Sequence, residues 1–65
     1  MLTTNAKIQA YRHQASMTQA DVAKKIGISR QMFCYKEAGK TEWKLKELEG
    51  LAAVFGISVK DLLGD

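Results

Sequence analysis

Apolar residues recur at helical spacing in the first part of the chain. Between Asn5 and Ala15, the apolar side chains of Ile8, Tyr11 and Ala15 follow one another at i, i+3 and i+7. This spacing places side chains on one face of a helix. It predicts a first helix over residues 5–15 with these three side chains facing inward. The chain has no proline and many helix-forming residues, which favours an all-α fold.

The segment Met17–Gly39 predicts two short helices joined by a glycine turn. Thr18 and Asp21 have the spacing of a capping box at the start of the first of these helices. Gly27 can end that helix, because glycine enters the left-handed region without steric cost. Ser29 can cap the second helix. Two short helices held at a fixed angle by such a turn have the form of a helix-turn-helix, here at about residues 18–38.

The residues of this motif divide into an inward and an outward set. Ala23 lies where two crossing helices need a small side chain. The apolar contacts are expected from Val22, Ile26, Ile28 and Phe33. The face of the second helix opposite Phe33 is largely polar and carries Arg30, Gln31, Cys34 and Tyr35. Long polar side chains in this arrangement suit the edges of nucleic-acid bases.

The last third of the chain predicts two further helices. One side of the fourth helix is expected to carry Leu45, Leu48, Leu51, Ala52 and Phe55. Gly56 ends it, and Gly50 inside it costs about 1 kcal/mol relative to Ala. Ser58 and Asp61 repeat the capping-box spacing and open a short fifth helix with Val59, Leu62 and Leu63. The predicted fold is a compact five-helix domain that spans residues 1–65.

The positions of several residues match a known family pattern across nearly the whole chain. The pattern consists of Gln19, Ala23 and Gly27, the run Glu37-Ala38-Gly39-Lys40, and the later segment 51–58. Their joint spacing resembles the Cro/CI-type helix-turn-helix family, also called XRE or lambda-repressor-like. The resemblance implies a lambda-repressor-like DNA-binding fold and a role in transcription regulation.

The resemblance also implies a set of DNA-binding residues. In the family, the residue equivalent to Gln19 approaches a phosphate and braces the recognition helix, whereas a lone Gln would simply face solvent. Gln31 and Arg30 have the chemistry of base readers, although Arg30 could equally bind a phosphate and both could be exposed helix formers. Tyr35 either packs on a sugar or thymine methyl, or shields the edge of the core. The predicted interface is Gln19, Ser29, Arg30, Gln31, Met32, Tyr35, Lys40, Thr41 and Lys44.

Arg12 and Glu37 resemble the two residues of a buried ion pair that, in the family, ties the first helix to the end of the recognition helix. The alternative is two unrelated surface charges.

The chain departs from the family pattern at three positions. Ala38 replaces a frequent Asn, so a side-chain phosphate contact is missing. Lys36 replaces an apolar residue, and we expect its stem on the core and its ammonium in solvent. Trp43 replaces Pro, and it covers that stem, fills a core gap or joins a dimer contact.

Charge is unevenly distributed. Residues 1–40 contain seven Lys or Arg and two acidic residues, whereas residues 41–65 contain three and five, so the two parts carry +5 and −2. The positive part contains the motif, as expected if it meets phosphates. A chain of 65 residues without a long apolar stretch or a signal-peptide core indicates a single cytoplasmic domain. The DNA-binding role that the resemblance implies would place it at the nucleoid. The lone Cys34 agrees with a reducing compartment.

Catalytic and metal-binding roles find little support in the sequence. His13 has no second ligand at metal-binding spacing, and Cys34 has no evident base partner. We therefore expect a protein that is not an enzyme and holds no metal or cofactor. We expect a repressor that binds a pseudopalindromic site on double-stranded DNA in the major groove, as a weak homodimer that is strengthened on DNA. The resemblance implies a dimer contact at Trp43 and Val59. The alternative is a protein-interaction module on the same scaffold, antitoxin-like or antirepressor-binding.

Overall fold

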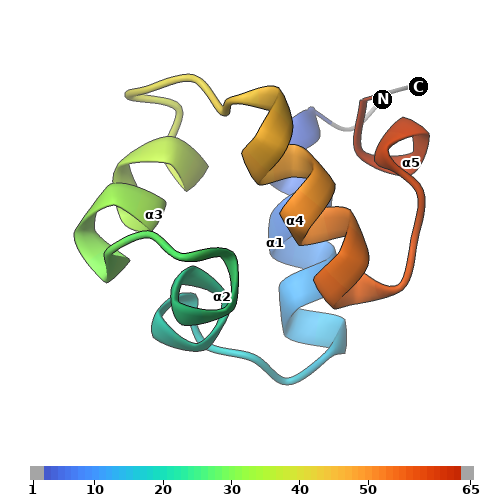
Figure 1. Ribbon diagram of the computed structural model, residues 1–65, viewed down its shortest axis with the longest axis horizontal. Coiled ribbons are helices and arrows are strands. Elements are labelled where there is room, and N and C mark those ends of the chain that lie inside the picture. The colour runs from blue at the N-terminus through green and yellow to red at the C-terminus, as the bar shows by residue number, and fades with distance from the viewer. Residues whose placement is uncertain (1–2, 64–65) are drawn as a thin grey trace.

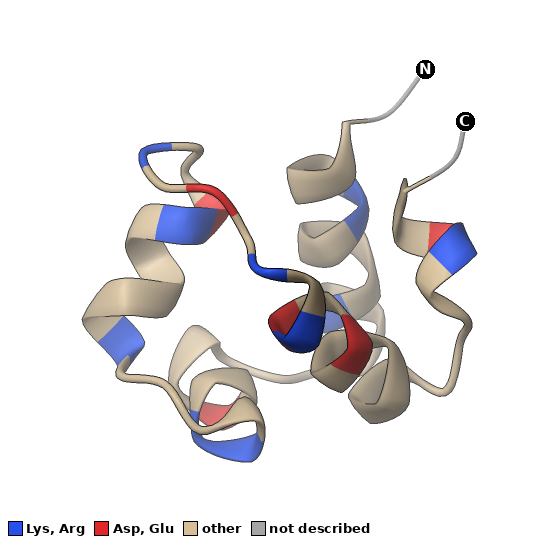
Figure 2. Ribbon diagram, turned by 45° about the horizontal axis from the view of Figure 1, so that its top comes forward, with Lys and Arg blue, Asp and Glu red and all other residues tan. Residues whose placement is uncertain are grey.

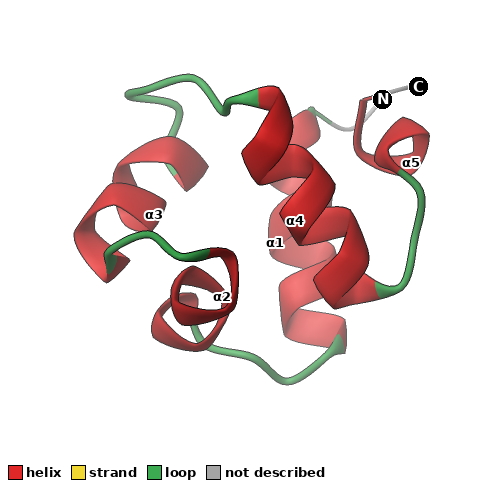
Figure 3. Cartoon of the chain, in the orientation of Figure 1, coloured by secondary structure: helices red, strands yellow, loops and turns green. Residues whose placement is uncertain are grey.

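The computed structural model describes residues 3–63 as five helices around one core (Figure 1). Their bounds are α1 Thr4–Gln14, α2 Gln19–Ile26, α3 Arg30–Glu37, α4 Leu45–Phe55 and α5 Val59–Leu63. Between residues 3 and 63 the chain contains helices and loops without a strand, as Figure 3 shows. The predicted all-α, five-helix fold is confirmed. Residues 1, 2, 64 and 65 of the predicted domain lie outside the described residues.

The first helix ends earlier than its apolar pattern predicts. Thr3 caps its start, because the Thr3 hydroxyl accepts a hydrogen bond from the Ala6 N–H at 3.1 Å. Ala15 was expected in the buried stripe, and this prediction is wrong. Ala15 is the C-cap residue and is exposed. Helical geometry ends at Gln14, with a ψ of 1° at Ala15 and a φ of 56° at Ser16, so the helical period does not extend to residue 15.

The predicted caps of the two motif helices are confirmed. At the start of α2, the Thr18 N–H donates to Asp21 at 2.9 Å and the Asp21 N–H donates to the Thr18 hydroxyl at 3.1 Å. The Thr18 backbone N–H, then its hydroxyl, and finally the charge of Lys25 hold the pKa of Asp21 below its ordinary value. At the start of α3, the Ser29 hydroxyl accepts from the Met32 N–H at 3.0 Å.

The core takes one large, fully buried side chain from each helix. In chain order these are Ile8, Val22, Phe33, Leu51 and Leu62, each less than 2% exposed. Burying one large apolar side chain per helix fixes all five helices against one another, since each contributes about 1.5–3 kcal/mol of transfer free energy. The ends of the domain are joined by the Thr4 hydroxyl, which donates to the backbone carbonyl of Leu62 at 2.9 Å.

Two leucines at helix ends lie outside this core. Leu45 was expected on the inner side of α4, but it is 62% exposed, so this prediction is wrong. It occupies the first residue of α4, where the helix has not yet reached the core. Leu63, the last residue of α5, is 53% exposed. The cap of α5 differs from the predicted capping box. The backbone N–H and the hydroxyl of Ser58 both donate to the Asp61 carboxylate, so the hydroxyl acts as a donor to that side chain.

Two glycines set how α2 meets its neighbours. Gly27 has a φ of 79° and lets the chain leave α2 through the left-handed region, as predicted. Ala23, 1% exposed, is a small buried residue at the predicted close approach of α2 and α3. Gly50 in α4 lies against α2, since a Cβ at this position would be 3.2 Å from the Ile26 side chain. The absence of a side chain at Gly50 therefore permits close packing of α4 on α2, although glycine lowers the helix propensity of α4.

The buried carboxylate of Glu37 joins α3 to α1 and α2. Glu37 is 4% exposed and accepts from Arg12 Nε at 3.1 Å and Arg12 Nη2 at 3.2 Å. It also accepts from Gln19 Nε2 at 2.8 Å. Arg12 in addition donates to the backbone carbonyl of Met17, which fixes the loop between α1 and α2. The predicted ion pair is confirmed, and it is a network of three side chains.

The preceding residue, Lys36, makes the second buried ion pair. Its ammonium was expected to reach solvent, but Lys36 is 4% exposed and pairs with the Glu47 carboxylate of α4, so this prediction is wrong. Glu47 also accepts from the Lys44 N–H at 2.8 Å. Burial raises the pKa of Glu47, but the hydrogen bonds from Lys36 and Lys44 and their charges outweigh burial and hold the pKa below its ordinary value of 4.5.

Trp43 completes the enclosure of Lys36. Its ring packs edge-on against Phe33, with 5.3 Å between ring centroids, and lies 5.9 Å from the Lys36 ammonium. Its indole N–H donates to the Asn5 side chain at 2.7 Å. Trp43 therefore covers Lys36 and fills the edge of the core, which are two of the three roles that the sequence left open for it. The two departures from the family pattern thus belong to one structural unit.

Removing one partner of the Glu37 network should destabilise the fold. Arg12→Ala or Glu37→Ala should each cost about 3–5 kcal/mol, because each leaves a buried charge without its partner. The double variant should lose less than the sum of the single losses, since both remove the same interaction. Urea melts in a stabilising osmolyte keep the single variants measurable. Strictly additive losses would contradict an energetic coupling between the two residues.

The Lys36–Glu47 pair should give the protein an acid-sensitive component of stability. A carboxylate whose pKa is lowered by folding stabilises the native state above its unfolded pKa, and this contribution is lost as pH falls through the lower, folded pKa. The stability difference between the wild type and Glu47→Gln should therefore be largest above about pH 4.5 and shrink below it. Glu49→Gln, which changes an exposed carboxylate of the same helix, is the control. A pH-independent difference would contradict this assignment.

Candidate nucleic-acid interface

The two motif helices and the loop after them occupy one end of the molecule. In Figure 1, α2, α3 and the loop to α4 lie on the left, and α5 lies at the opposite end. Figure 2 shows basic residues on α2, at both ends of α3 and in this loop, acidic residues on α2, at the end of α3 and in the loop, and both signs of charge near the start of α4. The ends of α3 therefore differ in surroundings, because only its last turn carries the two buried ion pairs.

The outward face of α3 forms a shallow hollow. Its walls are the four residues that the helical period had placed together: Arg30, Gln31, Cys34 and Tyr35. The hollow has a volume of about 280 Å³. All four residues are exposed, as is Met32 at 41% of its surface. The structure thus brings the predicted base-reading residues to one surface, and α3 presents them without using them in the core.

Within this face, Gln31 and Tyr35 contact each other directly. Gln31 Nε2 donates a hydrogen bond to the Tyr35 hydroxyl at 3.1 Å. The Lys40 ammonium, from the loop after α3, lies 5.4 Å from the centroid of the Tyr35 ring. Residues four apart on a helix are neighbours on its surface, so the spacing of Gln31 and Tyr35 was the signal available in the sequence.

Gln19 lies where α2 meets the end of α3. Its hydrogen bond to Glu37 braces α3, which agrees with one half of its predicted role. The same side chain lines a second hollow of about 470 Å³ at the start of α2. The other walls of this hollow are Arg12, His13, Ser16, Met17, Thr18 and Arg30. Arg30 borders both hollows, so it stands between the start of α2 and the outward face of α3.

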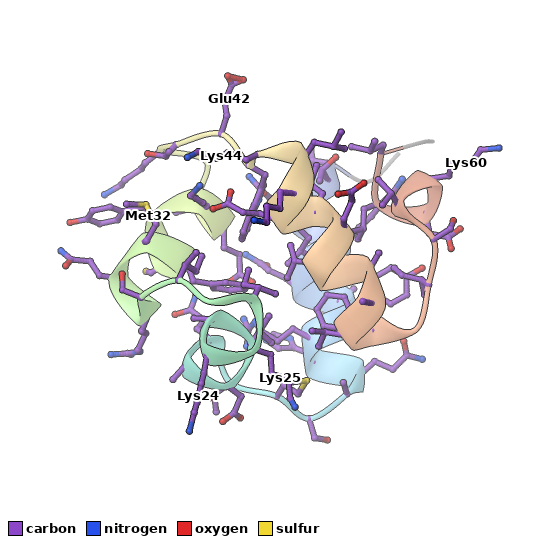
Figure 4. All side chains as sticks on the ribbon, in the orientation of Figure 1. Lys24, Lys25, Met32, Glu42, Lys44 and Lys60 are labelled. Atoms are coloured by element: carbon purple, nitrogen blue, oxygen red, sulfur yellow. The ribbon has the colours of Figure 1, made fainter. Side chains whose placement is uncertain are left out.

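The remaining predicted phosphate-binding residues flank α3 at its two ends. Ser29 caps the start of α3, whereas Lys40, Thr41 and Lys44 belong to the loop that follows it, and all four residues are exposed. In Figure 4 the side chain of Glu42 extends away from the body of the molecule, and Lys44 lies nearer to the start of α4. The Lys44 backbone is fixed by Glu47, which anchors the basic end of this loop.

The two predicted dimer residues are both half-buried. Trp43 packs on Phe33, and Val59 packs against the core cluster, so neither is a free surface side chain. The exposed apolar residue of α5 is Leu63, at 53%. Leu63 and Trp43 line a common hollow of about 280 Å³ together with Thr4, Asn5, Gly39, Thr41, Glu42 and Leu48. This hollow connects α5 to the loop before α4.

Other chemistry is sparse in the part of the chain that the structure describes. His13 and Cys34 are exposed, and no three His, Cys, Asp or Glu side chains of residues 3–63 lie together as metal ligands. None of the helices described is long and apolar enough to cross a bilayer.

Sequence reasoning missed the partner of Lys36, because Glu47 lies eleven positions away across a loop.

Comparison with known proteins gives relatives over nearly the whole chain. Residues 7–65 match the Cro/C1-type HTH DNA-binding domain family. An uncharacterized HTH-type transcriptional regulator of Methanocaldococcus jannaschii is 39% identical over 56 residues, which cover 86% of this chain and 85% of that protein. The cryptic phage CTXphi transcriptional repressor RstR of Vibrio cholerae is 30% identical over 61 residues, which cover 94% of this chain and 55% of RstR.

Solved structures of the same fold agree with this assignment. The SinR/SinI protein complex contains a chain that matches with a TM-score of 0.86 and 25% identity, covering 97% of this chain and 62% of that chain. The SOS-response transcriptional repressor LexA of Eubacterium rectale also matches with a TM-score of 0.86, at 27% identity, over the full length of this chain and 76% of that chain. The chain belongs to the Cro/C1-type helix-turn-helix DNA-binding family and is a transcriptional regulator with a helix-turn-helix domain.

Proposed function

We propose that this protein is a sequence-specific repressor that binds a pseudopalindromic operator in the major groove of double-stranded DNA. The observation that carries the proposal is the exposed polar face of α3, with Arg30, Gln31 and Tyr35 around one hollow. This face belongs to a helix whose last turn is fixed by two buried ion pairs. A polar helix face held rigidly at the surface suits direct readout of base edges.

In this arrangement α3 enters the groove and the flanking residues bind the backbone. Gln31 is the base reader, and Arg30, which borders both hollows, binds either a guanine or the adjoining phosphate. Gln19, Ser29, Lys40, Thr41 and Lys44 supply the phosphate contacts, with Met32 at the edge of the interface. Phosphate contacts set the register on the duplex, and base contacts set the sequence. Such a regulator acts on DNA in the cytoplasm, at the nucleoid.

The protein acts as a dimer with two recognition helices about 34 Å apart, one helical turn of DNA. The dimer contact uses Trp43 and the α5 segment with Val59, where the exposed Leu63 adds apolar surface beside the Trp43 hollow. A contact confined to this hollow and one short helix falls well below the roughly 1,200 Å² of stable interfaces. The dimer is therefore weak in solution and forms cooperatively on a full site.

A protein-interaction module on the same scaffold is the second candidate. The observation in its favour is that a chain of similar fold is found in a complex named for two proteins, SinR and SinI. Salt separates the two functions. DNA binding through about six phosphates makes log K fall with log salt at a slope of about −0.9 per phosphate. Affinity that is nearly independent of salt would favour a protein partner.

Selection of bound sites from random duplexes is the decisive experiment. A repressor of this kind should enrich a two-fold symmetric sequence whose half-sites are about 10 base pairs apart. The result would establish the class of ligand, the symmetry and the half-site together. Retention of random duplexes without enrichment would contradict sequence-specific binding, and no retention at low salt would contradict DNA binding.

Substitutions on α3 and in the loop should have different effects on binding. Gln31→Ala should lose about 1–3 kcal/mol of discrimination at one base pair in each half-site, because it removes a base contact. Lys44→Ala should weaken binding to all sequences about equally and reduce the salt slope by about one, because it removes a phosphate contact. The Lys44 backbone bond to Glu47 does not depend on its side chain. An unchanged sequence preference for Gln31→Ala would contradict its readout role.

A charge on the exposed surface of α5 should weaken the dimer without affecting the fold. Leu63→Glu should leave the melting temperature nearly unchanged, because Leu63 is half exposed, and should lower full-site affinity toward that of a half-site. Val59 is less suitable for this test, because it packs against the core.

Ala53→Glu, which adds the same charge at an exposed position of α4, is the matched control for this experiment. Affinities for full and half sites are compared by titration for the three proteins. Full-site affinity of Leu63→Glu equal to that of the wild type would place the dimer contact elsewhere. An equal loss in Ala53→Glu would assign the effect to net charge.

A further inference from the structure

We propose that Tyr35 is a positioning residue for Gln31, fixing the amide in the orientation that reads an adenine. The proposal rests on the DNA-binding function above. It begins from the hydrogen bond between Gln31 Nε2 and the Tyr35 hydroxyl at 3.1 Å, which joins two exposed side chains on the outward face of α3. An exposed Gln without such a partner would sample several rotamers and would lose them on binding.

The geometry of the amide explains which base this bond favours. Gln31 has two hydrogens on Nε2 and an acceptor at Oε1. When the hydrogen trans to Oε1 is donated to Tyr35, the hydrogen cis to Oε1 and Oε1 itself remain available at the free edge of the amide. This donor and acceptor pair matches N7 and the N6 amino group of adenine. The bond to Tyr35 thus restrains the amide while leaving its recognition edge open.

Tyr35 is itself restrained from a second direction. The Lys40 ammonium lies 5.4 Å from the ring centroid, within the range of a cation–π contact. The Tyr35 ring therefore has one contact at its hydroxyl and another at its face, although 40% of its surface is exposed. Order that exists before DNA binds reduces the entropy lost in the complex. The three residues form a prearranged reader that extends from α3 into the following loop.

Tyr35→Phe tests this role, because it removes the hydroxyl and keeps the ring. Discrimination for adenine at the base pair read by Gln31 should fall about 2- to 10-fold, the range of one neutral hydrogen bond. The loss should occur at the same base pair that Gln31→Ala affects. The double variant should discriminate no worse than Gln31→Ala alone, since Tyr35 acts through Gln31.

Other outcomes of the site selection would overturn the proposal. Unchanged preference in Tyr35→Phe would show that the hydroxyl does not position Gln31. A loss at a different base pair would make Tyr35 a direct reader. A preference other than adenine at the Gln31 base pair in the wild type would contradict the amide orientation. The salt slope of Tyr35→Phe should equal that of the wild type, which separates lost readout from lost phosphate contact.

A measurement on the protein without DNA keeps this proposal distinct from the proposed function. In Tyr35→Phe, the side-chain ¹⁵N–¹H₂ resonances of Gln31 should shift. The two amide protons should also move closer together in chemical shift, because the amide loses its partner. The side-chain amide of Gln9, exposed on α1, is the internal control. Unchanged Gln31 resonances would contradict the proposal whether or not DNA binds. Failure of the wild type to bind DNA would instead contradict the proposed function.

Discussion

The buried carboxylate of Glu37 determines how the recognition helix is oriented. It accepts hydrogen bonds from Arg12 on α1 and from Gln19 on α2, and only 4% of its residue surface is exposed. A charge in this position is tolerated only when its lone pairs are satisfied by well-placed donors. Apolar packing of one large side chain per helix holds the helices together but has little direction. The hydrogen bonds to Glu37 supply that direction.

The neighbouring Lys36 extends this constraint to α4. Successive residues on a helix point about 100° apart, so Lys36 and Glu37 reach different neighbours from the same turn. Lys36 pairs with Glu47 on α4, and Trp43 covers it while bonding to Asn5 on α1. The last turn of α3 is thereby fixed to three other helices. The outward face of the same helix carries the exposed residues and remains available for a ligand.

The parts of the structure that were predictable depend on residues close together in the sequence. The caps at Thr18 and Ser29 and the turn at Gly27 involve groups within four residues, so their spacing determines them. Ala15 and Leu45 were misplaced because both lie at helix ends, where periodicity cannot indicate how far the core extends. The Arg12–Glu37 pair spans 25 positions and was inferred from the family resemblance alone. Glu47 as the partner of Lys36 had no local signal.

The residues that hold the fold are thus separate from the residues on the outward face of α3. The side chains that fix α3 are buried and paired, and changing one of them alters the stability of the whole domain. Arg30, Gln31, Cys34 and Tyr35 are exposed and make no contribution to the core. Substitution at these four positions should therefore change the outward face of α3 at little cost in stability. A small scaffold whose α3 is fixed by buried residues can in this way vary the residues of its exposed face without losing its fold.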